Sequence, residues 1–326
     1  MKIIIRVALV LVGLAVILVA GLLTYVFAFL PNVPLEEVRI EYTHERIKRG
    51  EYLSRHVAQC SACHSERDWS RFSGPFKPGT EGSGGERYDR PLGFPGSYPA
   101  SNITPHNLQD WSDAELLRAI TGGVNRDGRP MFPVMPYPNY ARLDREDIYS
   151  IIAYIRSLPP VKHDVPAAET DFPMSIFIRL IPSAPEFSER PSRTDKVAYG
   201  KYVATAASCA ECHTPAERGR IIEEKLYSGG RFIQLEWGSV EASNITPDKE
   251  TGIGAWTEMD FIQRFKAFDK ASGKYENDAV EKGAFNTPMP WQGYAGMSEE
   301  DLAAIYAYLM TVKPLKNRVV KGKVVR

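Results

Sequence analysis

The chain of 326 residues contains four cysteines, which form two pairs with two residues between the partners, and a histidine directly follows each pair. The residues are Cys60, Cys63 and His64 in the first motif and Cys209, Cys212 and His213 in the second. Two thiols at this spacing can each add to one vinyl group of a haem, and the histidine can then bind the iron. The motifs therefore predict two covalently bound haem c groups with these histidines as proximal ligands.

Paired cysteines also occur in structural zinc sites and as disulfides in exported proteins. Neither alternative requires a histidine directly after each pair. The pairs of a zinc site are usually separated by roughly 12 to 20 residues, whereas a far longer stretch lies between Cys63 and Cys209. The two motifs therefore favour haem over zinc or disulfides.

The ligand on the other side of each iron could be a second histidine or a methionine. In the second unit of the chain His213 is the only histidine, which leaves methionine. We favour Met289, because prolines on both sides fix its backbone in a non-helical loop. Met297 is the alternative. Met259 and Met310 are less suitable because they lie on predicted helices, where a methionine more often fills the core.

In the first unit, Met135 occupies the position that matches Met289, and a proline follows it. Met131 is the alternative there. His56 and His106 could also bind iron in principle, but the second unit has no histidine at the corresponding places. Protein ligands on both sides of each iron favour electron transfer over the binding of a substrate.

An internal repeat organises most of the chain after its N-terminal segment. The matching blocks are residues 50–52 and 200–202, 100–105 and 242–247, 111–113 and 256–258, 135–137 and 289–291, and 147–154 and 301–308. Each unit is predicted to run as helix, haem motif, long irregular segment, short helix, methionine loop and helix, without convincing signals for paired strands. The expected fold class is therefore all-α.

Two kinds of residue recur in these blocks at positions that suggest a role around the haem. Asn102 and Asn244 could brace a loop beside it. Trp111 and Trp256 could donate an indole N–H to a haem propionate, although plain packing explains them equally well.

The N-terminal segment reads as a membrane anchor. Residues 7–30 contain no charged side chain, and about 20 apolar residues suffice for a helix to span a bilayer. A cleaved signal peptide is the alternative, but its apolar stretch is usually only about 7 to 15 residues long. Lys2 and Arg6 precede the segment, so the positive-inside rule leaves residues 1–6 in the cytoplasm and places the rest on the periplasmic or outer side of the bacterial inner membrane.

The anchor and the repeat divide the remaining chain. A juxtamembrane linker is expected at residues 31–43, the first haem domain at 44–160, an interdomain linker rich in proline and serine at 161–194, the second haem domain at 195–315 and a basic tail at 316–326. The 40 basic and 40 acidic residues balance, so no overall field would attract nucleic acid.

These blocks together resemble the cytochrome c subunits of membrane-bound alcohol and related periplasmic dehydrogenases. The resemblance rests on residues 244–256 and on 135–137, and it covers about residues 45 to 315. It implies two tandem class I cytochrome c domains, thioether links to all four cysteines, His64 and His213 as proximal ligands, and Met135 and Met289 as distal ones. Those subunits usually carry three haem motifs, whereas this chain has two; its layout is also similar to the dihaem subunits of haem-copper oxidases.

The predicted function is that of an electron carrier with no substrate of its own. Its donor would be a periplasmic dehydrogenase subunit or a quinol-oxidising partner, and its acceptor a soluble cytochrome or a terminal oxidase. The alternative is a dihaem, peroxidase-like enzyme, which requires one iron with an open position.

Overall fold

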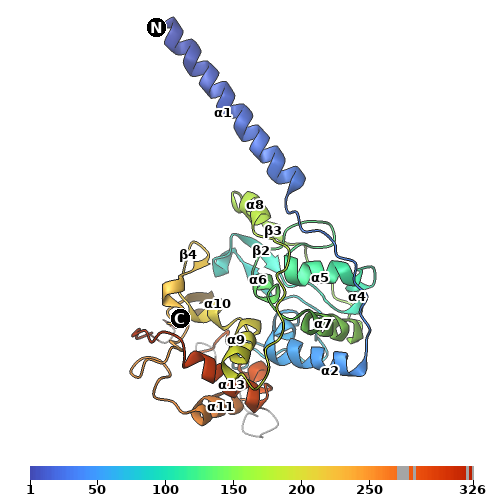
Figure 1. Cartoon of the computed structure of the whole chain (residues 1–326), viewed down its shortest axis with the longest axis vertical. Helices are drawn as coiled ribbons and strands as arrows, with labels where there is room; N and C mark the ends of the chain where they lie inside the picture. The colour runs from blue at the N-terminus through green and yellow to red at the C-terminus, as the bar shows by residue number, and fades with distance from the viewer. Residues whose placement is uncertain (270–278, 282–283, 321–322, 325–326) are drawn as a thin grey trace.

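The computed structural model of the chain describes residues 1–269, 279–281, 284–320 and 323–324. Helix α1 (Lys2–Phe29) projects from a globular body (Figure 1). Val26 is the only buried residue of α1. Within the described ranges, α1 is the one helix that is long and apolar enough to cross a membrane. In lipid, a single apolar segment forms a helix because a helix satisfies all of its backbone hydrogen bonds within the segment.

The first repeat unit is a set of helices that surrounds the first cysteine motif. In chain order they are α2 (His44–Tyr52), the π-helical turn η1 (Leu53–Val57), α3 (Cys60–Cys63), α4 (Pro105–Leu108), α5 (Asp113–Gly122), α6 (Tyr137–Tyr140) and α7 (Arg145–Ser157). Helices α2 and α7 pack directly on each other. A Cβ atom at Gly50 would lie 1.8 Å from the Ser150 carbonyl oxygen, so the absence of a side chain permits this close crossing.

The second unit repeats this arrangement. Its helices are α9 (Lys196–Ala206), α10 (Cys209–His213), α11 (Glu258–Lys266), α12 (Trp291–Ala295) and α13 (Glu299–Leu309). Helices α9 and α13 pack as α2 and α7 do, and a Cβ atom at Gly200 would lie 1.8 Å from the Ala304 carbonyl oxygen. The glycine of the first repeated block therefore serves the same helix crossing in both units.

Short strands lie in the long irregular segments, so the all-α expectation is confirmed only in part. One antiparallel sheet has the order β1 (Arg87–Asp89), β2 (Gly96–Pro99), β3 (Glu169–Thr170), and a second has the order β6 (Phe232–Leu235), β7 (Gly238–Glu241), β8 (Lys323–Val324). A hairpin joins β4 (Ala216–Glu217) to β5 (Arg220–Ile221). Strands of two to four residues are too short for alternation of apolar and polar residues to reveal them. The remaining turns are η2 (Arg90–Leu92) and η4 (Glu223–Lys225).

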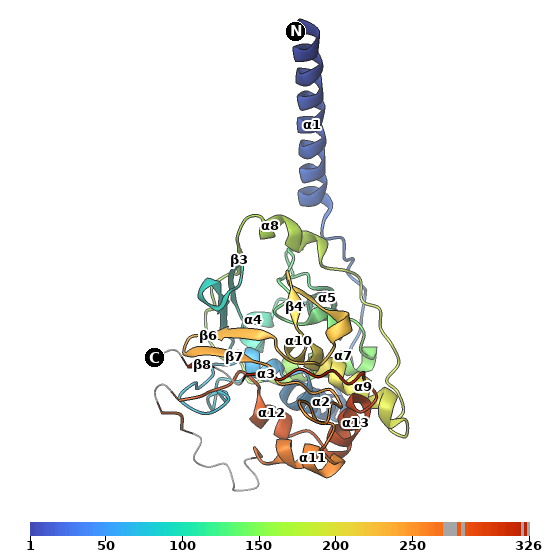
Figure 2. The same ribbon diagram turned by 90° about the vertical axis from the view of Figure 1, so that its left-hand side faces the viewer.

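The segment between the units packs along the body and is not a free tether. It contributes β3 to the sheet of the first unit and then forms α8 (Met174–Phe177) and η3 (Ile178–Leu180). Figure 2 places α8 at the end of the body from which α1 departs. Further on, Ser188 and Arg190 bond to the first unit, and Arg193 forms an ion pair with the second.

One continuous hydrophobic core joins the two units. Ile148 and Ile152 of α7 and Leu302 and Ile305 of α13 belong to the same cluster of buried side chains. Helix α6 of the first unit lies against α9 of the second, and α12 of the second lies against η1 of the first. The helices around the two cysteine motifs therefore pack into one continuous body.

Candidate haem sites

Both histidines of the cysteine motifs are held in the same way. The Nδ1 atom of His64 lies 2.7 Å from the Ser101 carbonyl oxygen, and Nδ1 of His213 lies 2.8 Å from that of Ser243. A carbonyl can only accept, so each imidazole donates through Nδ1 and keeps its Nε2 lone pair for a metal. Desolvation lowers the pKa of both imidazoles against the opposing effect of these hydrogen bonds, which favours the neutral, ligating form.

The loop that carries each carbonyl is braced by an asparagine. Asn102 accepts a hydrogen bond from the backbone of Thr104 at 2.9 Å and donates one to the Val161 carbonyl at 2.8 Å. Asn244 makes the same pair of bonds, to Thr246 at 2.9 Å and to the Leu315 carbonyl at 2.7 Å. Each amide therefore ties the loop to the chain just after the last helix of its own unit, which confirms the bracing role.

The cysteine pairs begin on matching turns. The residue before each pair is left-handed, with φ of 58° at Gln59 and 54° at Ser208. No disulfide joins any of the four cysteines, which leaves all of them for thioether bonds. In the first unit, the hydroxyl of Tyr88 lies 3.1 Å from Cys63 Sγ.

The structure places Met135 and Met289 in equivalent loops. In each loop the residue two positions later donates its backbone N–H back to the methionine carbonyl, at 2.7 Å from Tyr137 and 2.8 Å from Trp291. Both side chains are partly buried against the core. By contrast, Met297 is 1% exposed within the core and Met259 is 56% exposed on α11. Met310 follows the last residue of α13.

Several buried donors in the described part of the chain have no protein acceptor. They include Tyr137 Oη, Arg231 Nη1 and Trp237 Nε1. Tyr137 lies two residues after Met135. Arg231 follows Gly229 and Gly230, and the backbone N–H of Gly229 donates to the His213 carbonyl at 2.8 Å. A haem carries two propionates that would accept hydrogen bonds, so these donors fit such a group. The repeated sequence blocks indicate Trp111 and Trp256 for this role, whereas no sequence pattern marks Tyr137, Arg231 and Trp237, because an unpaired donor is evident only from the folded structure.

The two units meet with the cysteine motifs on the shared side. Asn139 of α6 donates to the Ser208 hydroxyl at 3.1 Å, directly before the second motif. In the opposite direction, His56 Nδ1 lies 2.9 Å from the Gly293 carbonyl of α12. Asn139 and Gly293 are equivalent residues of the repeat. The interface is therefore approximately symmetric, with each methionine loop leading into a helix that contacts the other unit. His56 is engaged in this interface, consistent with the preference for a methionine ligand.

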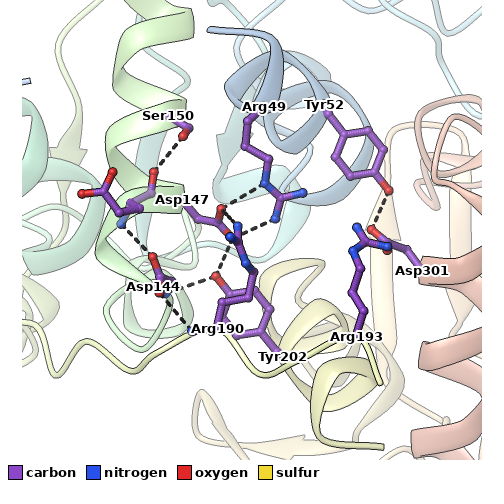
Figure 3. A network of polar contacts seen from close by, with 10 residues as sticks. Arg49, Tyr52, Asp144, Asp147, Ser150, Arg190, Arg193, Tyr202 and Asp301 are labelled. Atoms are coloured by element: carbon purple, nitrogen blue, oxygen red, sulfur yellow. Dashed lines mark hydrogen bonds and ion pairs between the residues drawn. The ribbon is translucent and has the colours of Figure 1, made fainter. Parts of the chain in front are cut away.

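A second pair of equivalent contacts ties the helix pairs together (Figure 3). The hydroxyl of Tyr52 donates to Asp301 at 2.7 Å, and the hydroxyl of Tyr202 donates to Asp147 at 2.7 Å. Tyr52 and Tyr202 match in the repeat, as do Asp147 and Asp301. Each tyrosine thus reaches the carboxylate of the other unit, and burial together with that carboxylate raises its pKa.

Three arginines neutralise these carboxylates. Asp147 pairs with Arg49 at 2.9 Å and with Arg190 at 2.6 Å, and Asp301 pairs with Arg193 at 2.8 Å. Burial alone would raise the pKa of Asp147, but Arg49, Tyr202 and Arg190 together outweigh it and the pKa is lowered. Arg190 and Arg193 belong to the segment between the units, so that segment fastens the interface (Figure 3).

We expect the substitution Arg49→Met to lower the free energy of unfolding by about 2 kcal/mol, because it removes one partner of a buried carboxylate that retains Arg190 and Tyr202. Urea unfolding of the detergent-solubilised holoprotein at pH 7, followed by circular dichroism, measures this. The depressed pKa of Asp147 contributes stability above its unfolded pKa of about 3.9, which is lost as the pH falls through the lower folded value. The difference in the free energy of unfolding between the unsubstituted protein and Arg49→Met should therefore become smaller as the pH falls below about 4.

The matched control is Arg46→Met on the same helix. Arg46 pairs with Glu146, whose side chain is 60% exposed, whereas that of Asp147 is 2% exposed. An exposed pair contributes about 0–1 kcal/mol. Equal losses for the two variants would contradict the role assigned to Arg49.

Comparison with known proteins places the two units in one family. The family model described as cytochrome c matches residues 47–159 and 197–313. The cytochrome subunit of fructose dehydrogenase from Gluconobacter japonicus is 30% identical over 86% of this chain and 55% of that protein. The cytochrome c subunit of the quinone alcohol dehydrogenase from Gluconobacter oxydans is 28% identical over 82% and 54%.

A protein named as a diheme cytochrome c-type, from Cereibacter sphaeroides, is 25% identical over 79% of this chain and 83% of its own length. The chain thus spans just over half the length of the two dehydrogenase subunits and most of this protein. The resemblance to cytochrome c subunits of membrane-bound dehydrogenases is confirmed.

Proposed function

Because the chain belongs to the cytochrome c family, we propose that it is a membrane-anchored dihaem electron carrier. The observation that carries the proposal is the duplicated histidine geometry, in which His64 and His213 each donate through Nδ1 to a carbonyl of the same repeated block. Each histidine is therefore orientated by its own unit before any metal binds. When bound, each haem iron alternates between the ferric and ferrous states and so carries one electron.

We assign the residues of the two sites from their equivalent positions. Cys60 and Cys63 would hold the first haem through thioether bonds, with His64 and Met135 as iron ligands. Cys209 and Cys212 would hold the second, with His213 and Met289 as iron ligands. The paired loops around the methionines and the unpaired donors Tyr137, Arg231 and Trp237 support this assignment. The haem domains would comprise residues 44–160 and 195–315.

The partners follow from the relatives. Two of these are named as cytochrome subunits of fructose and alcohol dehydrogenases, so a catalytic dehydrogenase subunit is the proposed donor. The proposed acceptor is a quinone, a soluble cytochrome or a terminal oxidase. Helix α1 would cross the bacterial inner membrane once, with both haem domains on the periplasmic side.

An optical spectrum of the purified protein tests the proposal. Pyridine haemochrome should count two covalent haems per chain, and the oxidised protein should show the weak methionine-to-iron band at the red end at a strength that corresponds to both haems. Two haems with the band halved or absent would mean that a distal ligand is wrong. Peroxide turnover at the rate of dedicated peroxidases would overturn the carrier and favour an enzyme with an open iron.

A further inference from the structure

The segment between the haem domains carries an exposed apolar patch. Phe172 is 81% exposed, and the same short stretch through α8 and η3 also exposes other large apolar side chains. These are Phe177 at 53%, Leu180 at 57% and Ile181 at 39%. Large aromatic and aliphatic side chains grouped in this way are typical of a surface that binds a membrane or another protein.

The patch lies against the end of α1. Helix η3 contacts α1, and Val26, in the last turn before Phe29, is the one residue of α1 that the protein buries. Arg179 donates to the Leu30 carbonyl at 2.9 Å, and its guanidinium lies 4.7 Å from the ring of Phe27. In both views α8 sits at the end of the body nearest to α1 (Figures 1 and 2).

The position of α1 fixes the depth of the patch. A helix of 28 residues is about 42 Å long, whereas the hydrocarbon core of a bilayer is about 30 Å thick. Lys2 and Arg6 hold the start of α1 at the inner surface, and about 20 further residues span the core. The last turn of α1 therefore lies close to the lipid headgroups on the outer side, and the residues fastened to that turn lie at the same level.

The charged groups beside the patch already have partners. Asp171, at its start, pairs with Arg90 at 2.5 Å. The guanidinium of Arg179 is occupied by the Leu30 carbonyl and the ring of Phe27. A surface of this kind, with apolar side chains outermost and charges satisfied at the side, suits the boundary between headgroups and acyl chains.

We propose that the segment 172–181 inserts its apolar side chains into the outer leaflet of the membrane as a second attachment point. The inference rests on the proposed crossing of the membrane by α1. Two attachment points, one at α1 and one on the body, would restrict the rotation of the haem domains about the end of the anchor. The domains would then face their partners in one orientation.

Site-specific photo-cross-linking of the full chain in intact bacterial membranes tests this. The photoreactive residue p-benzoylphenylalanine replaces Phe177 or Leu180 in turn, and Leu18 within α1 as the reference for lipid contact. Met259 on α11, 56% exposed, is the control at the far end of the body (Figures 1 and 2). After illumination, mass spectrometry identifies lipid adducts and gel electrophoresis identifies protein adducts.

The expected result is a lipid adduct at positions 18, 177 and 180 and none at 259. A lipid adduct at position 18 with none at 177 and 180 would overturn the second attachment point and leave the anchor standing. A cross-link from 177 or 180 to another protein would overturn it in favour of a partner interface. No lipid adduct at position 18 would overturn the anchor, and the inference with it.

Discussion

Replacing Met289 with leucine will remove about half of the methionine-to-iron absorption of the oxidised holoprotein and lower the reduction potential of one haem. Leucine keeps the shape and apolar character of the side chain, so the fold should be retained at a cost below about 1.5 kcal/mol. It lacks the thioether sulfur that would bind the iron. Methionine opposite histidine raises a haem potential, so its loss should appear as one lowered midpoint in a redox titration.

The repeat supplies matched controls for this prediction. Met297→Leu changes the rival methionine, which is 1% exposed in the core, and should leave both the band and the potentials unchanged. Met135→Leu should remove the other half of the band, Met131→Leu none of it, and the double variant M135L/M289L all of it. A band that survives M289L but disappears with M297L would show that the loop assignment is wrong in the second unit.

The cytochrome c family of this chain was predictable because short local motifs indicate it. Two cysteines and a histidine at fixed spacing predict a haem attachment point, and an apolar run without charge predicts a membrane anchor. The repeat matched the methionine loops at 135–137 and 289–291, and the structure gives them the same backbone bond. It also paired the glycines at positions 50 and 200, whose helix crossings the structure then explained.

The arrangement between the units was not predictable from the same patterns. The repeat matches Tyr52 with Tyr202 and Asp147 with Asp301, but it does not say that each tyrosine bonds to the carboxylate of the other unit. Nor could periodicity reveal strands of two to four residues that form within loops. Contacts between distant segments depend on tertiary packing, which overrides local preference and leaves no period in the sequence.

The segment 67–76 is the clearest example of a contact that sequence reasoning missed. It leaves the first cysteine motif and crosses to the second unit, where the ring of Phe72 stacks on Phe268 at 5.9 Å and that of Trp69 lies 4.7 Å from Trp237. Phe76 pairs back with Arg67, and Ser73 within this segment contacts the loop that precedes α12. We call segment 67–76 the arm of the first unit. Among the described residues, no segment of the second unit forms a hydrogen bond with the first methionine loop in the same way. The backbone N–H of Met131 instead donates to the Gly123 carbonyl of its own unit.

Ser73 is the residue of this arm that holds the Met289 loop. Its side chain is fully buried, and its hydroxyl donates to the Met289 carbonyl at 2.5 Å and accepts from the Trp291 N–H at 2.9 Å. Its own backbone N–H donates to the Asn286 side chain at 2.8 Å. One hydroxyl of the first domain therefore fixes the backbone on both sides of Pro290, next to the proposed ligand of the second haem.

Substituting Ser73 with alanine should consequently weaken the second site from a distance. The change removes one hydrogen bond from each of two partly buried backbone groups, which keep the bond of 2.8 Å to each other. We therefore expect the free energy of unfolding to fall by about 1–3 kcal/mol. Because the Met289 loop loses its tether, the methionine-to-iron band should decrease by up to half, while the contribution of Met135 persists. Absorption spectra of S73A, M135L and S73A/M135L measure this, since the double variant isolates the second haem.

Ser70→Ala is the control on the same arm, because Ser70 is exposed and its hydroxyl bonds only to the nearby Asp68 among the described residues. Ser70→Ala should leave the absorption spectrum and the free energy of unfolding unchanged within experimental error. If S73A lowers stability but the band of S73A/M135L equals that of M135L alone, then Ser73 supports the fold and has no hold on the ligand. If the band of the double variant falls, the first domain sets the coordination of the second haem, and the electronic properties of that site depend on how the two domains are joined.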